Sequence, residues 1–170
     1  MQIKYFEPFF KDLLDVLVFT NRSETPNKAF WRYFHTLLHT DSWFMTDIFD
    51  SRSAGYKSIK KVRIIHNSVA LRVTAAKGEP EVQTGSGNRK WLSQTDLSYT
   101  LIGFAGSILV APRSFGVTDT RKLKGYIHYW RVLGYLHGIE DAFNPFAGPI
   151  RVRNQRFIYP ITAESSIPIV

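Results

Sequence analysis

Residues 25–39 read TPNKAFWRYFHTLLH, and this stretch decides the fold that we expect. Thr25 precedes Pro26, and a hydroxyl residue followed by proline at the first helical position is a start signal for an α-helix. At 100° per residue the apolar side chains gather within about 140° and the polar ones fill an arc of about 100° opposite. The apolar arc, which we predict to be the inner face, consists of Phe30, Tyr33, Phe34, Leu37 and Leu38. The polar arc consists of Arg32, His35, Thr36 and His39.

Working outward, the same periodicity predicts helices on both sides of this stretch. We expect them at residues 5–19, at 56–73, at 97–111, and from the Thr118-Asp119 cap to Gly138, with a shorter helical segment through Phe49. Turn-forming residues predict a long loop at about 75–93. Residues 147–170, which contain several prolines, predict an irregular tail. The fold class is therefore mainly α: a single-domain helical bundle over residues 1–146, followed by the tail.

Composition restricts the chemistry that the chain can carry. It has 170 residues, of which 44% are hydrophobic and 21% charged, as in an ordinary globular protein. The absence of cysteine excludes disulfides, thiolate metal sites and cysteine nucleophiles. No signal peptide is visible at the N-terminus, and no apolar run is long enough to span a bilayer. The sequence therefore indicates no compartment.

The net charge of +8 suits an anionic partner. The cations are scattered and the aromatics fall mainly on predicted inner faces, so nucleic acid is an unlikely partner. A membrane surface remains compatible with the charge.

Two histidine patterns are candidates for a site. His66 lies at the centre of an apolar stripe in the helix at 56–73. It is either a core histidine bonded to a carbonyl or the buried neutral imidazole that haem iron takes as an axial ligand. His35 and His39 have the four-residue spacing of zinc-binding helices, but Thr36 stands where metalloproteases have their glutamate. The polar arc is thus either a solvated face or the wall of a polar pocket that faces His66.

Several stretches are similar to the family of latex-clearing rubber oxygenases and mpaB-type oxygenases, helical proteins whose better-known members hold haem b. These stretches are 32–36 (RYFHT) with 62–69 (VRIIHNSV), and then 94–104 and 125–139. The interval of thirty residues between Thr36 and His66 is of the kind that separates the family's threonine from its haem-binding histidine. The similarity covers about residues 20–145.

The resemblance implies a role for each matched residue. His66 would be the proximal haem ligand, and Arg32 and Thr36 would line the distal side of the pocket. His35 occupies the place of the family's lysine and would be a second axial ligand. Arg63, or a surface lysine, would meet the haem propionates.

The resemblance also departs from the family. Asp12 and Asp15 lie near the place of the acidic residue that serves as its catalytic base, but the alignment selects neither. The chain is short for the family, and this length implies an incomplete domain or a truncated form.

We therefore expect a haem-dependent oxygenase-like protein that acts on an apolar unsaturated substrate, isoprenoid or lipid-like. The alternatives are a non-catalytic haem- or lipid-binding module that has lost the base, and a basic domain that binds nucleic acid or a membrane surface without haem.

Overall fold

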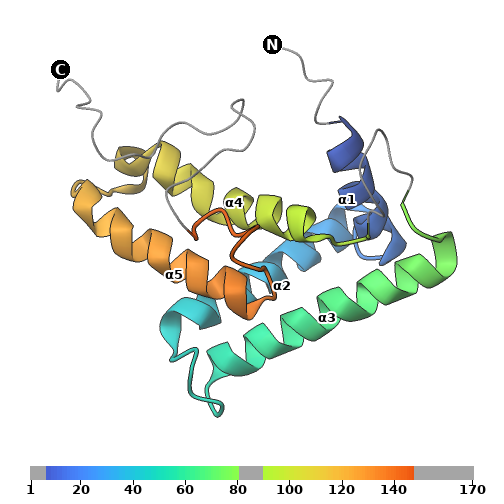
Figure 1. Ribbon diagram of the computed structural model, residues 1–170, viewed down its shortest axis with the longest axis horizontal. Coiled ribbons are helices and arrows are strands. Elements are labelled where there is room, and N and C mark those ends of the chain that lie inside the picture. Colours follow the sequence, from blue (N-terminus) through green and yellow to red (C-terminus); the bar gives the residue numbers. More distant parts are fainter. Residues whose placement is uncertain (1–6, 81–89, 148–170) are drawn as a thin grey trace. The chain divides into compact units, whose positions relative to one another are not determined.

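The computed structural model describes residues 7–80 and 90–147, and within them the chain is mainly helical, with no strand. The mainly α fold is confirmed. The α-helices are α1 (Glu7–Phe19), α2 (Pro26–Met45), α3 (Ala54–Lys77), α4 (Gln94–Val110) and α5 (Leu123–Leu136), as Figure 1 shows. Two short 3-10 helices, η2 (Pro112–Phe115) and η3 (Thr120–Lys122), lie between α4 and α5. Contacts divide the chain into a first unit up to Asp96 and a second from Leu97, and each is described by itself.

Helix α2 starts where the sequence predicts and ends later. The Thr25 side chain accepts a hydrogen bond from the Lys28 backbone N–H, and Pro26 is the first helical residue. The helix continues six residues past His39, to Met45, whereas residues 46–53 form turns and bends. The predicted helical extension to Phe49 is therefore wrong in its second half. No glycine or proline interrupts residues 27–45, so nothing ends the helix at His39.

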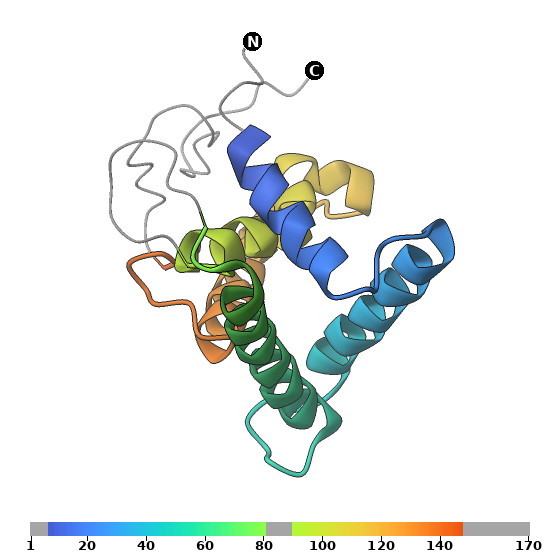
Figure 2. The same ribbon diagram turned by 90° about the vertical axis from the view of Figure 1, so that its right-hand side faces the viewer.

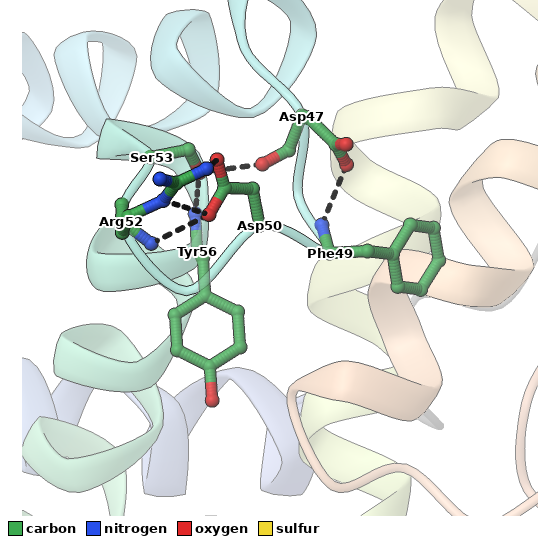
Figure 3. Close-up of polar contacts among 6 residues, drawn as sticks. All are labelled: Asp47, Phe49, Asp50, Arg52, Ser53 and Tyr56. Atoms are coloured by element: carbon green, nitrogen blue, oxygen red, sulfur yellow. Dashed lines mark hydrogen bonds and ion pairs between the residues drawn. The ribbon is translucent and has the colours of Figure 1, made fainter.

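The connection from α2 to α3 is held by side chains that bond backbone groups (Figure 3). The Asp50 carboxylate accepts from the Arg52 backbone N–H at 2.9 Å and from the Arg52 Nε at 3.1 Å. The Ser53 hydroxyl donates to the Asp47 carbonyl and accepts from the Tyr56 N–H at 3.0 Å. Ser53 thereby caps the first turn of α3.

A glycine sets the approach of α2 and α3 beside this connection. The Gly55 backbone N–H donates to Thr46 Oγ1 at 2.8 Å. A Cβ at position 55 would lie 2.6 Å from Thr46 Oγ1 and 2.9 Å from the Ser42 carbonyl oxygen, so only glycine fits without a shift. Figure 2 shows α2 and α3 meeting at this end and spreading apart toward the other.

The apolar cluster of the first unit lies at the far end of α3. It consists of Val16, Val73 and Trp91, with Phe19, Val69 and Leu92 packed against them. The Trp91 indole N–H donates to the Gly78 carbonyl at 2.8 Å, which ties the start of the predicted loop to its end. The loop is shorter than predicted, because α3 continues to Lys77; residues 81–89 lie outside the described residues.

Helix α4 begins earlier than predicted. The Ser93 hydroxyl accepts from the Asp96 N–H at 3.3 Å, and the Asp96 carboxylate accepts from the Ser93 N–H at 2.9 Å. This reciprocal pair has the form of a capping box, with aspartate in the acidic position. Residues 94–96 therefore belong to the helix, which starts three residues before the predicted residue 97.

The second unit packs α5 against α4 through aromatic and small side chains. The rings of Phe104 and Trp130 are stacked, with centroids 6.1 Å apart. The Tyr126 hydroxyl donates to the Ala105 carbonyl at 3.3 Å. Gly138 ends the segment with a φ of 95°, as the sequence predicts. The predicted tail lies outside the described residues from position 148 onward.

Candidate functional site

Helix α2 turns its polar arc, and not its apolar arc, toward the inside of the first unit. Arg32, Thr36 and His39 are half-buried, and Trp43 on the same side is buried. The predicted inner face is instead exposed, with exposed fractions from 41% to 62% for Phe30, Tyr33, Phe34, Leu37 and Leu38. The prediction that this apolar arc is the inner face is wrong. Within this arc His39 contacts α3 directly, through the Ser58 hydroxyl.

The main polar contact between α2 and α3 is the Ser58 hydroxyl. Ser58 is buried on α3, and its Oγ lies 2.7 Å from His39 Nδ1 and accepts from the Trp43 indole N–H at 2.9 Å. Burial lowers the pKa of His39 below its ordinary value, and the charges of Lys61 and His35 lower it further. A neutral His39 accepts the Ser58 hydroxyl proton, so the three side chains form one chain of hydrogen bonds.

Thr36 and Arg32 lie on the same side of α2 as His39, about one and two turns nearer the start of the helix. The Thr36 hydroxyl donates to the Arg32 carbonyl at 2.9 Å. The Arg32 guanidinium carbon lies 4.2 Å from the centroid of the Tyr33 ring, in cation–π geometry. The Arg32 Nε is buried and has no hydrogen-bond partner within residues 7–80 and 90–147. This N–H is available to an electron-rich group of a ligand.

The structure does not place His35 with Arg32 and Thr36. His35 is exposed, and its ring centroid lies 6.3 Å from that of Trp31 and 6.4 Å from that of Phe34. It therefore belongs to the exposed aromatic side of α2. To reach a ligand between α2 and α3, its side chain would have to turn.

His66 lies on the inward stripe of α3, as the sequence predicts. It is half-buried at the centre of the stripe, with Ile59 and Val73 buried at the ends and Val62 and Val69 half-buried between them. Arg63 on the same helix is exposed. The antiparallel helices α2 and α3 thus carry the Arg32–Thr36 side and the His66 stripe within one unit.

The candidates for the catalytic base, Asp12 and Asp15, lie on α1. The Asp15 carboxylate lies 3.9 Å from the Lys77 ammonium of α3, so it is paired with the end of that helix. The side chain of Asp12 lies outside the described residues. Among the described residues no carboxylate is therefore found beside Arg32.

The described residues contain no group of three or more histidine or acidic side chains that could hold a bare metal ion. The His35–His39 pair thus has no third ligand there, and zinc is not supported. A histidine ligand in this unit would need a metal that brings most of its own ligands, as haem iron does. None of the helices in the described part of the chain has the length and apolar character needed to cross a membrane.

Comparison of the chain with family models, with curated proteins and with solved structures finds no match.

Two contributors to this site were missed by sequence reasoning. Ser58 is absent from the sequence-based predictions, and Trp43 falls in the predicted shorter helical segment that follows His39. Spacing could have predicted the place of Trp43, because it follows His39 by four residues and therefore lies on the same side of the helix.

Proposed function

We propose that this chain is a haem-dependent oxygenase-like protein that acts on an apolar unsaturated substrate, isoprenoid or lipid-like, with His66 as the ligand of haem b. One observation carries the proposal. The polar side of α2, with Arg32 and Thr36, is half-buried where a solvated face would be exposed. It lies in the same unit as a half-buried histidine on an apolar stripe of the neighbouring helix.

The residues present fit haem in their chemistry. The aliphatic neighbours Val62 and Val69 would shield the imidazole of His66 from water, and the exposed Arg63 would meet a propionate at the protein surface. Arg32 would bind and orient the polar part of a ligand through its buried Nε–H. Haem, when bound, supplies the O₂ chemistry, while the protein supplies position and polarity.

His35 has a secondary place in this proposal. As an exposed side chain against Trp31, it is a weaker candidate for coordination than His66. We therefore expect His35 to contribute a displaceable second axial ligand. Its loss should change the spin state of bound haem without releasing it.

A non-catalytic haem- or lipid-binding module is the second candidate. The ion pair of Asp15 with Lys77 favours it, because the pair holds this carboxylate at the C-terminal end of α3, eleven residues along the chain from His66. O₂ consumption with isoprenoid test substrates separates the two candidates. Consumption that falls in Arg32→Gln supports the oxygenase, whereas a haem-loaded protein that consumes no O₂ supports the binding module.

Haem binding is tested by loading the purified protein with haemin and recording its absorption spectrum. We expect a Soret band with a 1:1 end point that is lost in His66→Ala. The matched control is His128→Ala, which removes an exposed histidine from α5 and should leave the band unchanged. Circular dichroism checks that both variants remain helical. A protein that stays colourless after loading, or a band that survives in folded His66→Ala, would refute the assignment.

A further inference from the structure

Helix α3 has a one-sided charge that the proposed haem site does not use. Over its 24 residues it carries six basic side chains and no acidic one. Lys77 is paired with Asp15, but most of the other basic side chains lie on the side of the helix away from the buried stripe. Helix α3 therefore carries a local excess of positive charge within a chain whose net charge is +8.

Exposed apolar side chains lie among these cations. We call this surface the outer face of α3; at 100° per residue it covers an arc of roughly 140°. Its exposed basic members are Lys57, Lys60, Lys61 and Arg72. Its exposed apolar members are Ile64, Ile65 and Leu71, with exposed fractions of 54%, 43% and 72%. The Arg72 guanidinium carbon lies 5.9 Å from the centroid of the Phe19 ring of α1. The three lysines and the three apolar side chains of this face are exposed.

We propose that the outer face of α3 binds the surface of an anionic phospholipid bilayer, with the helix lying in the plane of the interface. Lysine and arginine would meet the lipid phosphates, and their aliphatic stems would extend along the headgroups. Ile64, Ile65 and Leu71 would enter the boundary between headgroups and acyl chains, as the apolar side chains of interfacial helices do. Charge complementarity selects the anionic surface, because the face holds no carboxylate.

Nucleic acid fits this face less well. Binding to phosphates alone has no use for large exposed aliphatic side chains between the cations. Stacking on bases requires aromatic rings, and the outer face of α3 has none. The mixture of cations and aliphatics is explained by a surface that is anionic outside and apolar just beneath.

The test is cosedimentation of the full chain with two kinds of vesicle. The neutral vesicles contain phosphatidylcholine alone, and the anionic vesicles contain phosphatidylcholine with about 30% phosphatidylserine. We expect binding only to the anionic vesicles, with an affinity that falls as salt rises. The triple variant Lys57→Gln/Lys60→Gln/Lys61→Gln should weaken binding on the order of 100-fold. The double variant Ile64→Ser/Leu71→Ser keeps every charge and should still weaken binding by roughly 10-fold or more.

The matched control removes the same charge from the second unit. Arg113→Gln/Lys122→Gln/Lys124→Gln lowers the net charge by three at exposed positions outside α3. This variant should leave binding nearly unchanged. Equal losses in both triple variants would mean that only total charge matters and would overturn the proposal. So would equal binding to neutral vesicles, an unaffected Ile64→Ser/Leu71→Ser variant, or binding to duplex DNA in place of anionic vesicles. Circular dichroism confirms the helical fold of each variant. The assay uses no haem, so its outcome is independent of the proposed function.

Discussion

Helices α2 and α5 are both amphipathic, and they bury opposite kinds of side chain. In α5, Trp130 and Leu133 are buried, with exposed fractions of 3% and 0%. In α2, large apolar side chains such as Leu37 are exposed, while Arg32 on the opposite arc is half-buried. The neighbouring helix makes the difference. Helix α4 offers α5 rings and methyl groups, whereas α3 offers α2 a hydroxyl and a glycine. Amphipathic spacing therefore identifies two faces of a helix without saying which face is covered.

The largest expected effect comes from truncating a leucine on each helix. Leu133→Ala should lower the free energy of unfolding by about 2–5 kcal/mol, because it leaves a cavity beside fully buried neighbours. Leu37→Ala removes the same atoms from an exposed position and should change it by less than about 0.5 kcal/mol. Urea denaturation followed by circular dichroism measures both. A cost for Leu37→Ala comparable to that for Leu133→Ala would show that the apolar side of α2 is covered in solution.

A pair of glycine substitutions tests the close approach of α2 and α3. Gly55→Ala should destabilise the protein by about 1–3 kcal/mol, because its Cβ would contact Thr46 Oγ1 and a backbone carbonyl. Gly103→Ala, inside α4, meets nothing within 4 Å and should stabilise by up to about 1 kcal/mol. Thermal denaturation of the two variants gives the comparison. If Gly55→Ala is neutral, α2 and α3 pack less tightly at this point than the contacts indicate.

The smallest effect is a pH dependence that arises from His39. Its pKa in the folded protein is lower than the ordinary value of about 6.5 that applies in the unfolded chain. Above that pH both states are neutral, and the contribution of His39 to stability is complete. As pH falls below about 6.5 the unfolded chain binds the proton first, so this contribution is lost until pH passes the folded pKa.

A substitution of Lys61 tests the lowered pKa of His39. Removing its charge in Lys61→Gln should raise the pKa of His39 toward the ordinary value, because the positive charge of Lys61 disfavours protonation. NMR titration of the His39 ring protons measures the shift. Lys124→Gln, which removes a charge from α5, serves as the control and should leave the titration unchanged. A His39 pKa that does not respond to Lys61→Gln would mean that burial and the charge of His35 set it without Lys61.

Much of the local structure was predictable. The Thr25-Pro26 start of α2, the apolar stripe of α3 with His66 at its centre, and the stop at Gly138 all follow from spacing and backbone preference. These features depend on residues close together in the chain, so their physics is visible in the sequence. The sequence predicts an end of α2 near His39, whereas the helix continues through Thr40 and Ser42 to Met45. In fact the hydroxyls of Thr40 and Ser42 bond carbonyls of the preceding turn.

The candidate site was also predictable only in part. The residues Arg32, Thr36 and His66 could be selected from the sequence, but their burial could not. On the same side of α2, His39 and Trp43 are held against α3 by Ser58, which acts across the gap between the two helices. A hydroxyl that satisfies His39 and Trp43 removes the cost of turning polar groups inward, and this partner is invisible until the chain is folded.

The amino-acid sequence by itself determined the helices of this protein, the faces of each helix and the one-sided charge of α3, because these follow from local periodicity and composition. Only the tertiary structure decided that the polar side of α2 lies inward and that its aromatic side remains exposed. The physical reason is that local periodicity separates polar from apolar side chains, whereas the choice of the buried face depends on which groups the neighbouring helix supplies.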